Sequence, residues 1–301
     1  MTKCGLRVVF CCFVRRDTRA STTFLLLKYA RSGNIMGMTI KEFVAQEKVA
    51  LSQEVGSLKR APHLVIIQAN DNPASHAYVR GKIKDCDEVG ALATLCLLPP
   101  DTSEEYLLEK VAEYNNDPEV DGLIVQLPLP DHISEAKVKL AVNPAKDVDG
   151  FHPLTKFIPC TPKGIVDYLT AEGFAFQGKN AVVLGRSEIV GKPMAKLLLS
   201  KNCNVTVLHS KTTEEDKAFY IAHADLIVVA IGRLGFLDNR FQYKKDAVIV
   251  DVGINRNEEG KLRGDAIPDL PVAIQTPVPG GVGLLTRLAL VKNLILAAKT
   301  R

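Results

Sequence analysis

The sequence lacks a long apolar run, a C-x-x-C pair and a basic stretch interleaved with aromatic residues. No apolar run approaches the roughly 20 residues needed to cross a bilayer, so we expect no membrane-spanning segment. The seven cysteines show no metal-ligand spacing, and we interpret them as reduced thiols of an intracellular protein. Nothing in the body of the chain predicts a nucleic-acid partner. The 301 residues, 47% of them hydrophobic, suffice for two domains with well-formed cores.

Positive charge is concentrated at the N-terminus. Residues 1–37 hold seven basic residues and a single acid, Asp17, so the net charge of +4 for the whole chain leaves −2 for the remainder. We predict a cytoplasmic protein whose residues 1–37 are an extension, with translation starting at Met36 or Met38 as one interpretation. The alternative is a mitochondrial presequence, because the segment is acid-poor, Arg-rich and contains Ser and Thr. That alternative would place the protein in the mitochondrial matrix.

From Thr39 onward the chain alternates helical and strand patterns, which predicts an α/β fold with parallel sheets covered by helices on both sides. Thr39 and Glu42 form a capping-box pattern at the first helix. The expected helices are 39–58, 75–88, 103–115, 161–172, 190–200 and 284–299. The expected strands are 64–69, 91–98, 181–185, 205–208, 226–230 and 247–252, with one more ending in the proline-rich stretch 122–130.

The stretch 75–82 contains Ser75, Tyr78 and Lys82 at spacings of three and four residues. This spacing puts a hydroxyl, an aromatic ring and an amine on one helical face. Such a face can stack a flat ligand and move a proton beside it. Taken alone, the same pattern also fits an amphipathic helix with an ordinary surface lysine.

Two further polar groups interrupt apolar or turn sequences. Gln126 lies inside the run 122–130, and its amide can either hold the Lys82 amine or be satisfied by the strand-end backbone. Asp147 and Asp149 precede Gly150, and a loop of this kind fits a metal, an acid/base pair or the N–H donors of a heterocycle. Two carboxylates are too few for a metal site, and Lys146 argues against one.

The strand 181–185 leads into Gly185-Arg186-Ser187 and then a helix, the layout of a nucleotide-binding turn in a Rossmann-like domain. It is not the G-x-G-x-x-G fingerprint. The next strand ends in His209-Ser210-Lys211-Thr212 without an acid, which favours the 2′-phosphate of NADP over NAD. The alternative is that Arg186 and Ser210 belong to a solvated edge. Pro279, Gly280 and Gly281 form a loop that a flat cofactor or substrate can approach closely.

The chain resembles the methylenetetrahydrofolate dehydrogenase/cyclohydrolase (FolD-type) family from about residue 39 to the C-terminus. The resemblance rests on six motifs in the family's order: Ser75-x-x-Tyr78-x-x-x-Lys82, Val125 to Pro130, Lys146 to Gly150, Pro159-Cys160-Thr161-Pro162, Gly185-Arg186-Ser187-x-x-Val190-Gly191-x-Pro193 and Thr276 to Gly283. Six ordered motifs make chance agreement implausible.

The resemblance implies NADP-dependent oxidation of 5,10-methylenetetrahydrofolate and hydrolysis of the methenyl product to 10-formyltetrahydrofolate, in one-carbon metabolism and purine biosynthesis. It implies proton handling by Lys82, orientation by Gln126, stacking by Tyr78, a pterin contact from Asp149 and no metal. Substrate contacts would include Ser75, Pro279, Gly280 and Gly281, and cofactor contacts Gly185, Arg186, Ser187, Ser210 and Ile254. The implied partners are tetrahydrofolate derivatives and a second copy in a homodimer.

The implied organisation is a catalytic domain at 38–160, an NADP-binding domain at 161–283 and a C-terminal helix at 284–301 that returns to the first domain. The chain departs from the family in its short segment 154–158 and in Leu284-Leu285-Thr286-Arg287, where Pro-Met-Thr is common. Two other functions remain alternatives: a non-catalytic folate or dinucleotide sensor, and a different two-domain Rossmann oxidoreductase of the shikimate dehydrogenase kind.

Overall fold

The computed structural model describes residues 37–300. Residues 1–36 of the predicted N-terminal extension, for which a presequence is the alternative interpretation, lie outside these described residues, as does the alternative start at Met36. Residues 38–301 form one compact unit by their contacts, and this unit contains two separate parallel sheets. No helix within the described range is long and apolar enough to cross a membrane.

The first sheet has three parallel strands in the order β2-β1-β3. They are β1 (His63–Gln68), β2 (Leu92–Leu97) and β3 (Gly122–Val125). The helices around it are α2 (Ile40–Gly56), α3 (Pro73–Val89), α4 (Glu104–Asn116) and α5 (Glu135–Ala141). Alternate residues of β1 face two different cores: Leu64 and Ile66 pack with α2 and α3, whereas Val65 and Ile67 pack with α4 and α5. Helices therefore cover both faces.

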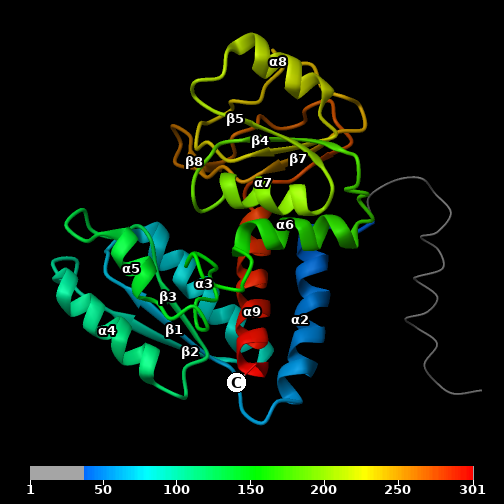
Figure 1. Ribbon diagram of the computed structural model, residues 1–301. Helices are drawn as coiled ribbons and strands as arrows, with labels where there is room; N and C mark the ends of the chain where they lie inside the picture. Colours follow the sequence, from blue (N-terminus) through cyan, green and yellow to red (C-terminus); the bar gives the residue numbers. More distant parts are fainter. Residues whose placement is uncertain (1–36, 301) are drawn as a thin grey trace, which may run out of the picture. The chain divides into compact units, whose positions relative to one another are not determined.

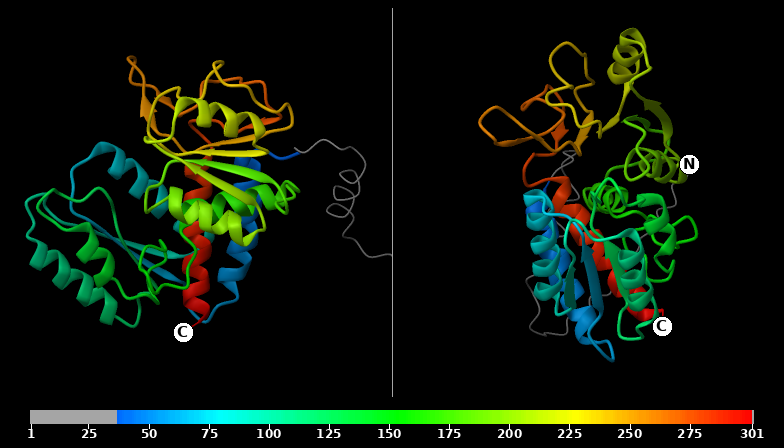
Figure 2. Two further views of the ribbon diagram at one scale, coloured as in Figure 1. Left: turned by 45° about the horizontal axis from the view of Figure 1, so that its top comes forward. Right: turned by 90° about the vertical axis from the view of Figure 1, so that its left-hand side faces the viewer.

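The second sheet has five parallel strands in the order β10-β7-β6-β4-β5. They are β4 (Asn180–Leu184), β5 (Asn204–Leu208), β6 (Leu226–Val229), β7 (Val248–Asp251) and β10 (Ile274–Gln275). Figures 1 and 2 show α8 (Glu214–His223) on one face and α6 (Cys160–Ala171) with α7 (Gly191–Ser200) on the other. A small antiparallel pair joins β8 (Asn255–Arg256) to β9 (Leu262–Arg263).

The C-terminal helix α9 (Val282–Lys299) runs beside α2 and contacts α6, α2 and α3 (Figure 1). Its buried residues, among them Leu285, Leu288, Val291 and Leu294, point in all directions around the helix axis. A helix that is apolar all round is buried on all sides. Because α9 begins at the glycine loop and packs on α3, it connects the second sheet to the helix that carries Lys82.

Every predicted helix and strand is present, with ends within two residues of the predicted ones. The capping box is also confirmed: Glu42 N donates to Thr39 Oγ1 at 3.2 Å, and Thr39 N donates to Glu42 Oε2 at 2.8 Å. The prediction omitted α5, α8 and the short strands β8, β9 and β10. These elements are short, and α5 and α8 each bury only one or two side chains.

Candidate active site

Helix α3 presents the predicted polar face. Asn72 caps the helix by accepting a hydrogen bond from Ala74 N at 2.8 Å, and Pro73 follows in the first turn. Ser75 Oγ donates to Leu127 O at 3.4 Å, and Lys82 Nζ donates to Gln126 Oε1 at 3.1 Å. Lys82 Nζ lies 5.6 Å from the centre of the Tyr78 ring. Lys82 is only 5% exposed, which distinguishes it from a surface lysine.

The amide of Gln126 is oriented by its neighbours. Gln126 N donates to Ile67 O at 2.8 Å and so continues the pairing of β3 with β1. Its Nε2 donates to Leu127 O at 2.7 Å, which leaves Oε1 for Lys82. Asn70 Nδ2 holds the following turn by donating to Pro128 O at 2.8 Å. The sequence analysis did not single out Asn70, although an amide directly after a buried strand is a usable signal.

The two acids of the 146–150 segment have different environments. Asp147 accepts hydrogen bonds from Gly150 N at 3.2 Å and His152 N at 2.7 Å, so it holds the turn together. Burial raises the pKa of Asp147 above the usual Asp value. Asp149 is half-buried and lines a small cavity beside β3 with Phe151. Lys146 Nζ donates to Tyr114 O and Asp117 O, at the end of α4. Residues 37–300 contain no group of three or more potential metal ligands.

Asn293 of α9 holds the segment that carries Asp149, and the sequence analysis missed it. Its Nδ2 donates to Val148 O at 2.9 Å and to Ile158 O at 3.1 Å, and the residue is 1% exposed. Cys160 Sγ donates to the same Val148 O at 3.3 Å. An amide in an otherwise apolar helix is the signal that could have revealed this role, because a buried amide needs partners.

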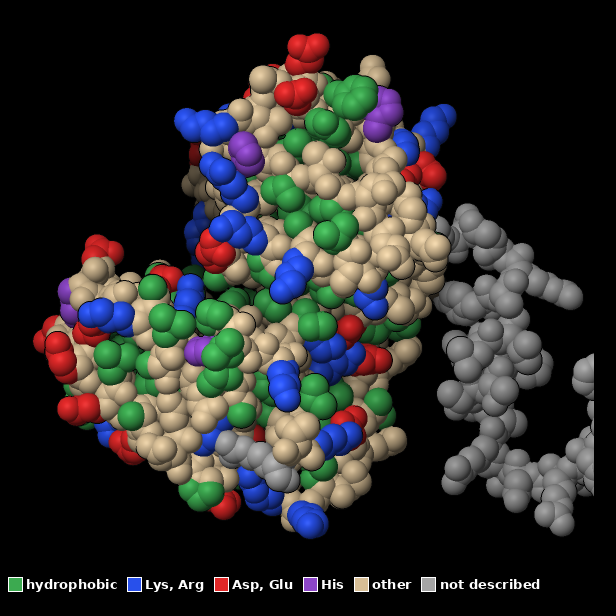
Figure 3. Space-filling model, in the orientation of Figure 1, with side chains coloured by type: hydrophobic (Ala, Val, Ile, Leu, Met, Phe, Trp, Pro, Cys, Tyr) green, Lys and Arg blue, Asp and Glu red, His purple; other side chains and the backbone are tan. Residues whose placement is uncertain are grey.

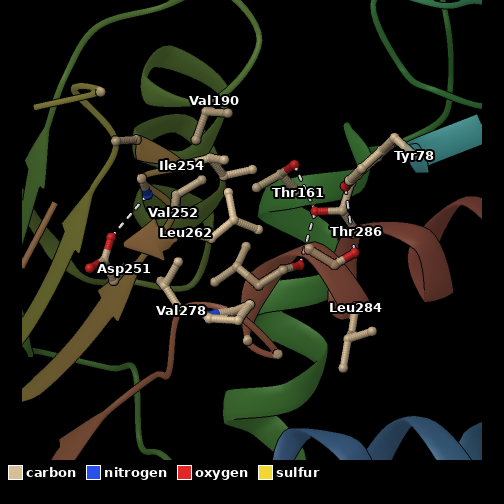
Figure 4. A pocket seen from close by; sticks show the side chains of 18 of the residues that line it. Tyr78, Thr161, Val190, Asp251, Val252, Ile254, Leu262, Val278, Leu284 and Thr286 are labelled. Atoms are coloured by element: carbon tan, nitrogen blue, oxygen red, sulfur yellow. Dashed lines mark hydrogen bonds between the residues drawn. The ribbon is translucent and has the colours of Figure 1, made fainter. Parts of the chain in front are cut away.

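A cavity of about 650 Å³ lies where the two sheets, α3 and α9 meet (Figure 4). Its volume is typical of small-molecule sites. The predicted site residues in its wall are Tyr78, Ser187, Ile254, Pro279, Gly280 and Gly281. Ser75, Lys82, Gln126, Asp149, Gly185, Arg186 and Ser210 are not in this wall. Thr161 and Thr286, whose hydroxyls are 3.0 Å apart, complete the side next to Tyr78.

The glycine loop forms a further part of the cavity wall, next to Tyr78. Gly280 has a φ of +92°, and a Cβ on Gly281 would lie 2.1 Å from Pro277 O, so both positions require glycine. Tyr78 Oη donates to Gly283 O at 3.5 Å. Burial raises the pKa of Tyr78 to about 12. The phenol therefore stays protonated near neutral pH and offers a ring face and a donor rather than a base.

The turn after β4 is built for close backbone approach. Gly185 has a φ of +117°, and a Cβ there would lie 2.4 Å from Ala230 O. Ser187 Oγ accepts from Val190 N at 3.2 Å and Gly191 N at 3.3 Å, which caps the start of α7. Arg186 and Ser210 are both exposed, and each follows by two residues the paired strand ends Leu184 and Leu208. The parallel register thus brings these two residues to the same sheet edge.

Two buried acids that the sequence analysis did not identify fix the loops at the cavity's far end. Asp251 Oδ1 accepts from Gly253 N and Asp265 N, each at 2.9 Å, and Oδ2 accepts from Ala266 N at 2.8 Å. Asp265 Oδ2 in turn accepts from Ile231 N at 2.8 Å. Burial raises the pKa of Asp251 to about 6, against the opposing effect of its backbone donors. The signal for Asp251 is a carboxylate at the end of a buried strand; Asp265, two residues after the half-buried β9, has no such signal.

Arg287, a departure noted in the sequence, lines the cavity and extends toward α3. Its Nε lies 2.8 Å from Asp85 Oδ2. The Nε–H nevertheless forms no hydrogen bond, so the pair is held by charge rather than by an aligned donor. A Cβ on Gly81 would lie 1.8 Å from Arg287 Nη1, which shows that the guanidinium occupies the space a side chain would take.

Comparisons with known proteins agree with this geometry. The family profile described as the tetrahydrofolate dehydrogenase/cyclohydrolase catalytic domain matches residues 32–149, and the corresponding NAD(P)-binding domain matches residues 159–301. A bifunctional protein FolD from Oceanobacillus iheyensis is 46% identical over 276 residues, which cover 86% of this chain and 95% of that protein.

Solved structures give the same result. The FolD enzyme of Campylobacter jejuni has a TM-score of 0.83 at 38% identity and covers 86% of this chain and 96% of its own. The FolD of Trypanosoma brucei, complexed with NADP and an inhibitor, has a TM-score of 0.83 at 30% identity and covers 88% and 97%. The predicted fold class, enzyme class and dinucleotide cofactor are confirmed, and the shikimate dehydrogenase alternative is set aside. With relatives of this identity matching nearly end to end, the chain belongs to the tetrahydrofolate dehydrogenase/cyclohydrolase family.

Proposed function

We propose that the protein oxidises 5,10-methylenetetrahydrofolate to the 5,10-methenyl form with NADP⁺ and hydrolyses that product to 10-formyltetrahydrofolate. The observation that carries the proposal is the buried contact between Lys82 and Gln126, next to Tyr78 in the cavity wall. A lysine amine that is held by a glutamine amide beside an aromatic ring can accept a proton next to a flat, cationic folate stacked on that ring. The enzymes named in the comparisons carry out both steps.

The residues present fit NADP. At Gly185 and in the glycine loop, the absence of a side chain leaves room for a cofactor that a Cβ would fill. Arg186 and Ser210 would hold the 2′-phosphate, since residues 209–213 at this edge include no acid. Figure 3 shows several Lys and Arg side chains on the flank of the part that contains β5 and α7. When bound, NADP⁺ supplies the acceptor for the hydride of the folate methylene carbon.

The chain's own residues would position the folate for that transfer. Tyr78 offers its ring face to the aminobenzoyl group, and its phenol remains a donor because of its raised pKa. Asp149 is half-buried, and its backbone O accepts a hydrogen bond from Cys160 N. Its carboxylate would accept hydrogen bonds from the amino and ring N–H groups of the pterin. Pro279, Gly280, Gly281 and Ser75 would supply the other folate contacts. Ile254, in the same cavity wall, would contact the cofactor.

In the hydrolytic step, water attacks the methenyl carbon and must lose a proton. The Lys82 amine accepts that proton, and Gln126 Oε1 orients the amine. In the resulting hydroxyl adduct the C–N5 bond then breaks as the formyl C=O forms, and the hydroxyl proton passes to N5.

We further infer that the domains are 38–160 and 161–283, with 284–301 returning to the first, as the packing of α9 on α2 and α3 supports. A homodimer is supported by the edge strand β2, where Leu92 and Leu97 are 56% and 57% exposed. A cytoplasmic location is supported by the unpaired cysteines at 86, 96, 160 and 203.

The test of this proposal is Lys82→Met. We expect cyclohydrolase activity to fall by at least ~100-fold, the usual contribution of a positioned base, while NADP⁺ affinity is retained. Hydrolysis is followed by the loss of methenyl absorbance, and NADP⁺ binding by calorimetry. The matched control is Lys84→Met on the exposed side of the same helix. If Lys82→Met hydrolyses methenyltetrahydrofolate at the wild-type rate, Lys82 does not have this role.

A further inference from the structure

Helix α3 carries a buried carboxylate, that of Asp85, which lies between cations from two other helices. The side chain of Asp85 is 4% exposed. Lys48 Nζ of α2 is 2.5 Å from Asp85 Oδ1, and Arg287 Nε of α9 is 2.8 Å from Oδ2. Each oxygen of Asp85 therefore has its own cation, and Lys48 also contacts Glu88 Oε2 at 2.5 Å.

Asp85 follows Lys82 by three residues, and both side chains are buried. Residues three apart on a helix are neighbours, so a Lys and an Asp at this spacing can form an ion pair. In the structure Lys82 Nζ instead donates to Gln126 Oε1 at 3.1 Å. Because Lys48 and Arg287 each lie against one carboxylate oxygen, their positive charges offset the attraction of Asp85 for the lysine.

Arg287 owes its position to Gly81. A Cβ at position 81 would lie 1.8 Å from Arg287 Nη1 and 3.2 Å from Arg287 Cδ, so only glycine leaves room for the guanidinium against α3. Glycine inside a helix costs about 1 kcal/mol relative to alanine. Gly81, directly before Lys82, carries this cost in helix stability.

We propose that Arg287 is a positioning residue for the hydrolytic step. By holding Oδ2 of Asp85, it prevents Asp85 from pairing with Lys82, so that the Lys82 amine stays directed at Gln126 and free to accept a proton. This inference rests on the proposed role of Lys82, and it adds a function for Arg287, Asp85 and Gly81.

Other charged and titratable groups lie on the elements around Lys82. Burial raises the pKa values of Tyr78, Cys86 and Cys160, so these groups are neutral near pH 7. The remaining groups from the elements packed around Lys82 are Asp85 on α3, Lys48 on α2, Arg287 on α9, and Asp147 and Asp149 on the 146–150 segment. Among these acids, only Asp85 lies on the same helix as Lys82, at a spacing of three residues that allows the two side chains to pair. Arg287 contacts Asp85 directly.

The experiment measures cyclohydrolase kcat from about pH 6 to about pH 8.5, corrected for uncatalysed hydrolysis, in purified full-length protein. Arg287→Met releases Oδ2 of Asp85, and we expect kcat to fall about tenfold at neutral pH, with the profile shifted about one pH unit upward. Gly81→Ala displaces the guanidinium without removing its charge, and we expect a shift in the same direction. Arg287→Lys restores the charge and should return the profile toward that of the wild type.

The double variant Arg287→Met/Asp85→Asn distinguishes positioning from a purely structural ion pair. Positioning predicts that removing the competing acid returns the pH profile of the double variant to its original place, and that Asp85→Asn alone shows no upward shift. The control Lys299→Met removes a different contact between α9 and α2, the 2.5 Å pair with Glu54, and should leave the profile unmoved.

The inference is overturned if Arg287→Met keeps the wild-type profile, or if Asp85→Asn fails to correct it in a variant that unfolds at the wild-type temperature. These outcomes are separate from a failure of the proposed function. If Lys82→Met is inactive and Arg287→Met is normal, only the inference about Arg287 fails. If Lys82→Met is active, the role of Lys82 itself fails.

Discussion

At the scale of single residues, Asp251 should give the protein a distinct dependence of stability on pH. Its pKa is raised by burial to about 6 from the usual 3.8. The folded state therefore favours the protonated acid, and this stabilising contribution is full below about pH 4 and is lost as the pH rises through about 6. The difference corresponds to an amount on the order of 3 kcal/mol.

The measurement is the free energy of unfolding in urea, compared between the wild type and Asp251→Asn at several values between about pH 4 and pH 7. Asn keeps the shape and cannot titrate, so the wild-type value minus the variant value should decrease as the pH rises. A difference that stays constant, or that increases with pH, would show that Asp251 does not titrate in this way.

The Lys82–Gln126 contact could be predicted because an amide in an apolar run requires a partner. The roles of Asp85 and Asn293 could not be predicted from the sequence. Their partners Arg287 and Val148 are far away in the sequence, and no local pattern links residues so distant from one another. Gly81 was part of a quoted motif, yet only the structure shows that it makes room for Arg287.

At the scale of secondary structure, α9 holds the catalytic segment through one amide. Replacing Asn293 by Ala removes the amide donor from the carbonyls of Val148 and Ile158 and leaves Val148 O with only the weaker Cys160 Sγ donor. We expect a loss of about 2 kcal/mol in stability or more, because an unsatisfied buried polar group costs about 1–3 kcal/mol. We also expect a raised KM for methylenetetrahydrofolate, since Asp149 loses its support, with little change in NADP⁺ affinity.

Urea unfolding and steady-state kinetics check this expectation. The matched control is Asn116→Ala, which removes an exposed amide that donates to Ala112 O within α4. An unchanged KM in Asn293→Ala would contradict the link between α9 and the Asp149 segment, even if stability falls.

Strong periodicity made the long helices and central strands predictable. Helix α2 has a capping box, and β6 is an uninterrupted apolar run that is buried along its whole length. The omitted elements give weaker signals. Helix α5 has seven residues with only Val138 buried, and β8, β9 and β10 have two residues each. Tertiary pairing, rather than local pattern, defines elements of this length.

At the scale of the described molecule, one cavity is lined by segments from both sheets and by α3 and α9. The glycine loop and the turn after β4 belong to the second sheet, Tyr78 comes from α3, and α9 continues from the glycine loop to the underside of α3. The same helix thus forms part of the cavity wall and, through Arg287, contacts the helix that carries Lys82. This connection offers a physical route by which substitutions in α9 would affect hydrolysis more than hydride transfer.

The central claim is that one site performs both steps with NADP⁺. The most direct test mixes the purified protein with 5,10-methylenetetrahydrofolate and either NADP⁺ or NAD⁺ and follows the reduced cofactor and the methenyl intermediate by absorbance in one trace. We predict faster reduction with NADP⁺ and only transient methenyl absorbance. Accumulating methenyl would contradict the hydrolytic role, and no reduction with either cofactor would contradict the account as a whole.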